Sequence, residues 1–190
     1  MANVTPPALG WPVGGYYRPK IVQHPRSGEW VLWMRWLVLN NGPLSQHHNT
    51  FYLSASAPHI SGPRTLGQRN ISTQYCDPGD FFLFVDEPSG DGYLLYTARD
   101  PKAGRHLRIE ALRSDFLSSA WEMGGASSPF FGDVGEAPAM FQRRGVYYAV
   151  WGGFCCFCMS GEQGHLCQQW KSFGPNGTEN GGRYIHLLCA

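Results

Sequence analysis

The sequence DFFLFVDEPSGDGYLLYTA, residues 80–98, contains two apolar runs separated by a turn. Both runs, residues 81–85 and 93–96, are rich in aromatic and aliphatic side chains, which is typical of strands buried in a sheet. Between them, Ser89-Gly90-Asp91-Gly92 supplies residues that accept the positive φ angles of a tight turn. This stretch therefore predicts an antiparallel β-hairpin.

The same pattern recurs on either side of this hairpin, as RPKIVQHPRSGEWVLWM (residues 18–34) and EAPAMFQRRGVYYAVWG (residues 136–152). Aligning the expected turn glycines, Gly28, Gly92 and Gly145, gives separations of 64 and 53 residues, close to the length of one four-stranded propeller blade. Residues 50–55 and 107–112 add further strand-like pieces, and no stretch shows sustained helical periodicity. We expect an all-β fold, an incomplete β-propeller of about three blades where closed propellers have about four to eight, with a β-sandwich as the alternative.

Composition limits the class of partner. The chain has 190 residues, of which 15% are charged and 14% are aromatic, and its formal net charge is +1. These values predict one globular unit without a basic face for nucleic acid or anionic lipid. We expect a monomer that binds roughly neutral molecules and no membrane. The N-terminal residues lack the features of a signal peptide, whereas the sequons at Asn3, Asn70 and Asn176 would suit a secretory history, so the localisation stays open.

Two acidic residues stand where an apolar strand begins, Asp80 before FFLFV and Glu136 before APAMF. In a propeller the starts of the inner strands point toward the central channel, where several blades meet one ligand. A pair of carboxyl groups there has the chemistry of glycoside hydrolysis, in which one protonates the leaving oxygen while another activates water or stabilises charge. The alternative is that both are solvated turn residues. Asp86 and Glu87, in the hairpin that follows, are interpreted as turn residues.

Five segments together carry a resemblance to a known family. In order they are RPKIVQHPRSGEWVLWM, SAPHISGP, DFFLFVDEPSGDGYLLYT, LRIEALRSDFLS and GEAPAMFQRRGVYYAVWG, and they cover residues 17–153. This part of the chain resembles glycoside hydrolase family 43, especially its exo-β-1,3-galactanase-like branch. The resemblance implies a five-bladed propeller that acts on a galactan or a related polysaccharide.

The resemblance also implies roles for individual residues. Glu136 would be the general acid, and Asp80 the aspartate that tunes and positions it. Members of the family generally invert the anomeric centre, for which the acid and base carboxyl groups stand about 6.5–9.5 Å apart. The galactanase-like branch commonly carries an acidic residue before the RPK segment, but here that position is Tyr17, which cannot act as an anionic base near neutral pH. We expect poor hydrolysis, and we expect Tyr17, Arg18 and Trp151 to bind substrate.

Aromatic and cysteine residues leave further alternatives. Trp33, Tyr96 and Trp151 occupy equivalent second strands, where packing between blades is favoured over sugar stacking. Stacking on a sugar is open to the aromatic residues Trp11, Tyr16, Tyr17 and Trp170. The cluster at Cys155, Cys156 and Cys158, followed by Cys167, lacks paired CxxC spacing and favours local disulfides or free thiols over a zinc site.

These interpretations divide the chain into an N-terminal extension (residues 1–16), a partial five-bladed propeller (17–167) and a divergent tail (168–190). No cofactor is expected. The family brings a channel calcium into consideration, but the sequence does not identify ligands for it. Besides an impaired glycosidase, two alternatives stay open, a propeller that only binds carbohydrate and a truncated gene product.

Overall fold

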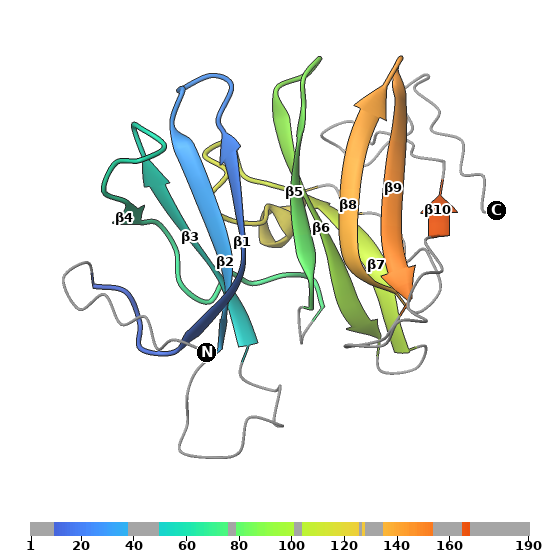
Figure 1. The fold of residues 1–190 in the computed structure, drawn as a ribbon, viewed down its shortest axis with the longest axis horizontal. Coiled ribbons are helices and arrows are strands. Elements are labelled where there is room, and N and C mark those ends of the chain that lie inside the picture. Colours follow the sequence, from blue (N-terminus) through green and yellow to red (C-terminus); the bar gives the residue numbers. More distant parts are fainter. Residues whose placement is uncertain are drawn as a thin grey trace.

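The computed structural model describes residues 10–37, 50–75, 79–100, 104–125, 127, 135–153 and 165–167. Within these residues the chain forms antiparallel strands in three separate sheets and one short 3-10 helix, η3 (Trp121–Met123). Three sheets side by side (Figure 1) rule out the two-sheet sandwich that the sequence left as an alternative. The prediction of an all-β chain is confirmed.

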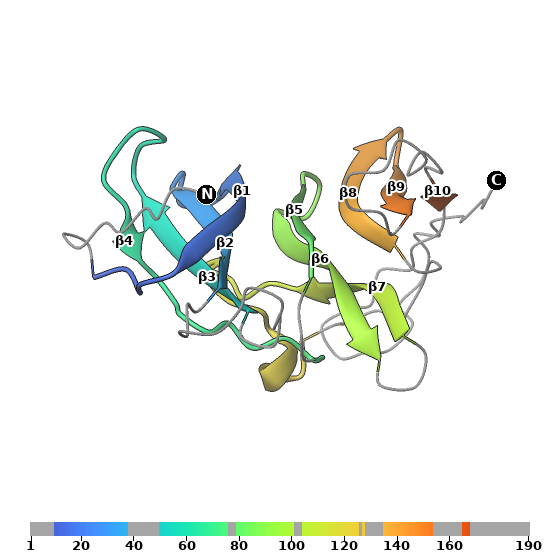
Figure 2. The same ribbon diagram turned by 60° about the horizontal axis from the view of Figure 1, so that its bottom comes forward.

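Each sheet is built around one of the predicted hairpins. The first sheet has the order β1 (Gly15–Gln23), β2 (Trp30–Leu37), β3 (Thr50–Ala57) and β4 (Thr65–Leu66). The second contains β5 (Phe81–Asp86), β6 (Asp91–Asp100) and β7 (Gly104–Ala111), and the third contains β8 (Gly135–Arg143), β9 (Val146–Gly153) and β10 (His165–Cys167). The strands that come first in the sequence of each sheet, β1, β5 and β8, lie side by side: β5 contacts both β1 and β8 (Figure 2). We call β1, β5 and β8 the inner strands.

The middle sheet is buried on both faces, which explains its continuous apolar sequence. Along β5, Phe81 and Leu83 pack toward the first sheet, whereas Phe82 and Phe84 pack toward the third. Two apolar clusters therefore hold the three sheets together. Trp33 and Tyr96 are fully buried in the first cluster, and Trp151 is buried in the second, as expected for packing between sheets.

The turn of the second hairpin differs from the prediction. Gly92 was expected to be the turn glycine, but it lies within β6 opposite Val85, and Gly90 takes the left-handed conformation with φ +71°. Gly28 and Gly145 do occupy the turns of their hairpins, with φ +75° and +77°. Position 92 requires glycine for another reason, since a Cβ there would lie 2.6 Å from the Phe116 ring.

The segment after β7, residues 112–119, returns to the first sheet. Its backbone carbonyl oxygens accept hydrogen bonds at 2.7 Å from three side chains of that sheet and its β1–β2 turn: from Trp33 Nε1 to Phe116, from Ser54 Oγ to Leu117, and from His24 Nε2 to Ser114. The His24 tautomer follows from its other contacts, because Nδ1 accepts from the backbone N–H groups of the turn that follows. The LRIEALRSDFLS segment thus joins the first two sheets and gives the inner strands a fixed relative position.

Candidate functional site

The first and third inner strands begin in the same unusual way. A β-bulge starts at Tyr17 in β1 and at Glu136 in β8. In each strand the next residue has a positive φ, +50° at both Arg18 and Ala137, and a proline follows it. A non-glycine residue rarely takes this conformation, so its occurrence at both positions shows that the two strand starts share one local geometry. Tyr17 and Glu136 therefore hold corresponding positions in their sheets.

Asp80 connects all three sheets at this end of the molecule. It immediately precedes β5, and only 5% of its side-chain surface is exposed. One carboxylate oxygen, Oδ1, lies 2.5 Å from Arg18 Nε and 3.9 Å from Arg35 Nη1, both on the first sheet. The other, Oδ2, accepts a hydrogen bond of 3.1 Å from the backbone N–H of Ala137 on β8. The burial of this carboxylate is therefore compensated by charge and by hydrogen bonds.

Glu136 is half-buried next to this arrangement. Burial, above all, raises the pKa of its carboxyl group, and the negative charge of Asp80 raises it further. Arg105, Arg18 and Arg35 act in the opposite direction and lower that pKa, but the net effect is upward. A carboxyl group with a raised pKa can hold a proton at a higher pH than usual and can therefore donate it.

Sequence reasoning brought Asp80 and Glu136 to one region, and the structure puts Asp80 in contact with the residue that follows Glu136. The sequence did not predict that Arg35 and Arg105 belong to this site. Arg35 is the one charged side chain in the apolar strand β2, and that position was an available signal, because a charge within a buried strand needs a partner. Arg105 lies on β7, and no pattern in the sequence links it to Glu136.

The three residues expected to bind substrate differ in placement. Arg18 reaches Asp80 and keeps 48% of its side-chain surface exposed. Tyr17 is partly buried at the start of β1, with its ring against Gly15 of the same strand. Trp151 has only 4% of its surface exposed, because it packs in the cluster between the second and third sheets. This burial favours a packing role for Trp151, and the substrate-binding role expected of it stays a prediction.

Asp86 also differs from its interpretation as a turn residue. It is the last residue of β5, only 6% of its surface is exposed, and it accepts a hydrogen bond of 2.6 Å from the Tyr147 hydroxyl of β9. Asp86 therefore joins the second sheet to the third. Glu87 does lie in the turn and is exposed.

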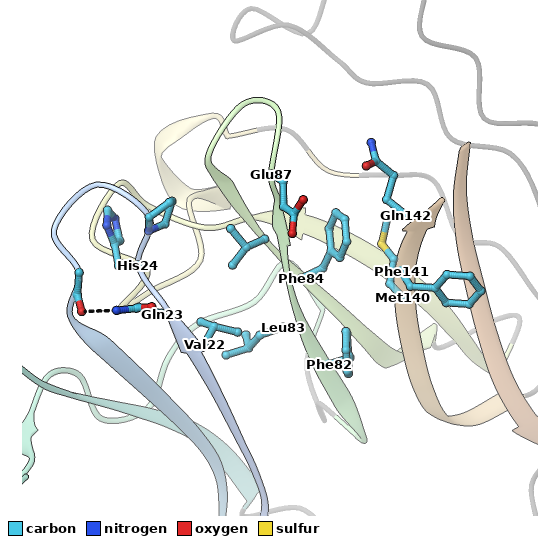
Figure 3. Close-up of a pocket in the computed structure, with 13 residues that line it drawn as sticks. Val22, Gln23, His24, Phe82, Leu83, Phe84, Glu87, Met140, Phe141 and Gln142 are labelled. Atoms are coloured by element: carbon cyan, nitrogen blue, oxygen red, sulfur yellow. Dashed lines mark hydrogen bonds between the residues drawn. The ribbon is translucent and has the colours of Figure 1, made fainter. Parts of the chain in front are cut away.

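A cavity of about 700 Å³ lies toward the other end of the inner strands (Figure 3). It is lined by the last residues of β1, by most of β5, by the second half of β8 and by residues of the turns after β1 and β5, including Phe82, Phe84, Glu87, Met140 and Phe141. Neither Asp80 nor Glu136 lines it. The cavity is thus separate from the carboxyl pair at the strand starts.

Metal ligands do not gather in the described part of the chain, where no three His, Cys, Asp or Glu side chains come together as a metal site would need. The channel calcium that the resemblance raised stays an untested possibility, and these residues name no ligand set for it. Cys155, Cys156 and Cys158 and the ring of Trp170 lie outside the described residues. No helix within the described ranges has the length and apolar character needed to cross a membrane.

Comparison with solved structures identifies the class of protein that shares this fold. No family model matches the sequence, and no curated protein matches it. Similar solved structures are glycoside hydrolases of family 43 and related enzymes. Three of these structures are 13–18% identical to the chain in sequence, and similarity at this level establishes the fold alone. The described part of the chain has a fold like that of family 43.

Three of these structures define the match. A thermostable family-43 glycoside hydrolase is 13% identical with a TM-score of 0.65, over 94% of this chain and 55% of that one. The exo-β-1,3-galactanase from Phanerochaete chrysosporium is 18% identical with a TM-score of 0.62, over 81% and 32%. An endo-arabinase from Bacteroides thetaiotaomicron is 15% identical with a TM-score of 0.57, over 94% and 63%. The chain thus spans about a third to two thirds of the length of these three structures.

Proposed function

We propose that this chain is a glycosidase-like domain of the family 43 type that binds a galactan or a related polysaccharide and hydrolyses it poorly. In this proposal the three sheets are consecutive blades of a five-bladed propeller, and the starts of the inner strands form the glycan site. The observation that carries it is the carboxyl group of Glu136, half-buried beside Asp80 with a raised pKa.

Glu136 would act as the general acid. Protonation of the leaving oxygen needs a carboxyl group that is still protonated at the working pH, and burial together with a neighbouring carboxylate supplies it. Asp80 would tune and position this acid. Its own oxygens are engaged by Arg18, Arg35 and the Ala137 N–H, which makes Asp80 a poor candidate for activating water.

Poor hydrolysis follows from position 17. Inversion needs a carboxylate that deprotonates water on the face of the sugar opposite the acid. The strand start that corresponds to Glu136 carries Tyr17, whose side chain is a phenol and not a carboxylate. The loss of one member of an acid and base pair removes about 10²–10⁴-fold of rate. Binding of the glycan does not need this group and would persist.

The test measures binding and turnover separately. The purified chain and its Glu136→Gln variant are assayed for hydrolysis of β-1,3-galactan and for retention on a gel that contains the same polysaccharide. We expect retention of both proteins and little or no turnover, any residual turnover being abolished in the variant. Robust turnover that the variant loses would keep the acid assignment and overturn the impairment. Absence of both retention and turnover would overturn the proposed function itself.

A further inference from the structure

Several arginine side chains of the described residues lie around the starts of the inner strands. Arg18, Arg35 and Arg105 all act on Glu136 as positive charges, whereas Asp80 is the only negative charge among the described residues that acts on it. Asp80 is already paired with Arg18 and Arg35. A ligand at this end of the molecule would therefore meet arginine side chains as well as the two carboxyl groups.

Arg18 is the more exposed of the two arginines that lie against Asp80. Its side chain keeps 48% of its surface exposed, whereas that of Arg35 keeps 16%. It contacts Asp80 through Nε, and Asp80 is the one carboxylate of the described residues with which it pairs. A guanidinium carries five N–H donors in a rigid plane, so donors remain for a second acceptor.

The backbone holds Arg18 in this place. Its φ of +50°, followed by a proline, costs free energy in a residue other than glycine. The conformation belongs to the bulge that starts at Tyr17, and the short contact with Asp80 fixes the far end of the side chain. An arginine restrained at both ends loses less conformational freedom when it binds a ligand.

We propose that Arg18 makes this site selective for acidic glycans, in which the sugar unit bound beside Glu136 carries a carboxylate, as a hexuronate does. The inference rests on the proposed function, because it takes the strand starts as the glycan site. A carboxylate accepts two parallel N–H bonds from a guanidinium, an arrangement that a neutral hydroxyl group cannot reproduce.

A purely structural role for Arg18 makes a different prediction. If the side chain served only to hold Asp80, its loss would disturb the site for every sugar to the same extent. A role in selectivity predicts that its loss weakens the binding of acidic sugars much more than that of neutral ones. The ratio of the two affinities separates these roles.

The experiment uses two disaccharides that differ in one group, β-1,3-galactobiose and the same compound with C6 of the non-reducing unit oxidised to a carboxylate. Binding to the full chain is measured by calorimetry at low salt. We expect the oxidised compound to bind about 10–100-fold more tightly, the range of a hydrogen bond to a charged group. Arg18→Gln should reduce this preference to about threefold or less.

Two further variants control the test. Arg26 lies in the β1–β2 turn, and its side chain is 60% exposed and pairs with Asp91 of β6. The Arg26→Gln variant should keep the full preference for the oxidised compound. Arg18→Lys keeps the charge but not the planar fork, and should lose at least threefold of the preference. It decides the question if Arg18→Gln does not fold, which circular dichroism would show.

Equal binding of the two disaccharides by the unmodified chain would overturn the proposal, as would an Arg18→Gln variant that weakens both alike. Full preference in a folded Arg18→Lys protein would also overturn it. If galactobiose binds and the oxidised compound binds no better, the proposed function stands and only the selectivity fails. If neither compound binds, both fail.

Discussion

Replacing Asp80 by asparagine tests whether one buried carboxylate holds the three sheets together. Asparagine keeps the shape and removes the charge, so the side chain loses its attraction to Arg18 and Arg35 and its hydrogen bond from the Ala137 N–H weakens. A hydrogen bond to a charged group contributes about 1.5–3 kcal/mol, and breaking a buried ion pair costs about 3–5 kcal/mol. Because 48% of the Arg18 side chain is exposed, water replaces part of that pair.

We therefore expect Asp80→Asn to lower the free energy of unfolding by about 2–3 kcal/mol, measured by urea denaturation followed through tryptophan fluorescence. The matched control is Asp91→Asn, because Asp91 also pairs with an arginine, at 3.2 Å, but both side chains are more than half exposed. Exposed pairs contribute little, and the control should lose less than about 1 kcal/mol. If the two variants lose the same amount, Asp80 does not have the structural role that its contacts indicate.

Three further predictions follow from the packing and from the pKa of Glu136. Gly92→Ala should lower the free energy of unfolding by about 1–3 kcal/mol in urea denaturation, because the new methyl group overlaps the Phe116 ring; an unchanged midpoint would contradict this contact. Tyr147→Phe should cost about 1–3 kcal/mol, because it leaves buried Asp86 without its hydroxyl donor, and a neutral effect in the same assay would argue against that bond. The pKa of Glu136 is raised above its ordinary value of 4.5, so the folded state holds its proton to higher pH than the unfolded state, and stability falls as pH rises through that window. Glu136→Gln should remove this fall, and pH profiles of unfolding that run parallel in the two proteins would refute it.

The hairpins could be predicted from the sequence because their signals are local. Apolar runs on both sides of a glycine-bearing turn defined all three, and the burial of Trp33, Tyr96 and Trp151 followed from their equivalent positions. The choice between Gly90 and Gly92 failed because both glycines satisfy the local rule. The Phe116 ring that requires glycine at position 92 comes from a later segment.

The candidate site also contains residues that the sequence predicted and residues that it did not. The position of Asp80 and Glu136 at strand starts was visible in the sequence, and both start an apolar run. The arginines that surround them were not, because Arg35 and Arg105 reach this end of the molecule from strands that are far apart in the chain. Asp86 was misread for the same reason, since its partner Tyr147 lies 61 residues away.

The contacts of Asp80 bear on how this domain can change during evolution. Because the carboxylate joins the three sheets, selection for a folded protein retains it whether or not catalysis continues. Under the proposed function, a descendant that has lost catalysis would therefore still carry this aspartate, whereas a residue with a purely chemical task is free to change. Among related sequences, the residue at position 17 would help to distinguish active members from inactive ones. The presence of Asp80 would not, because both kinds would retain it.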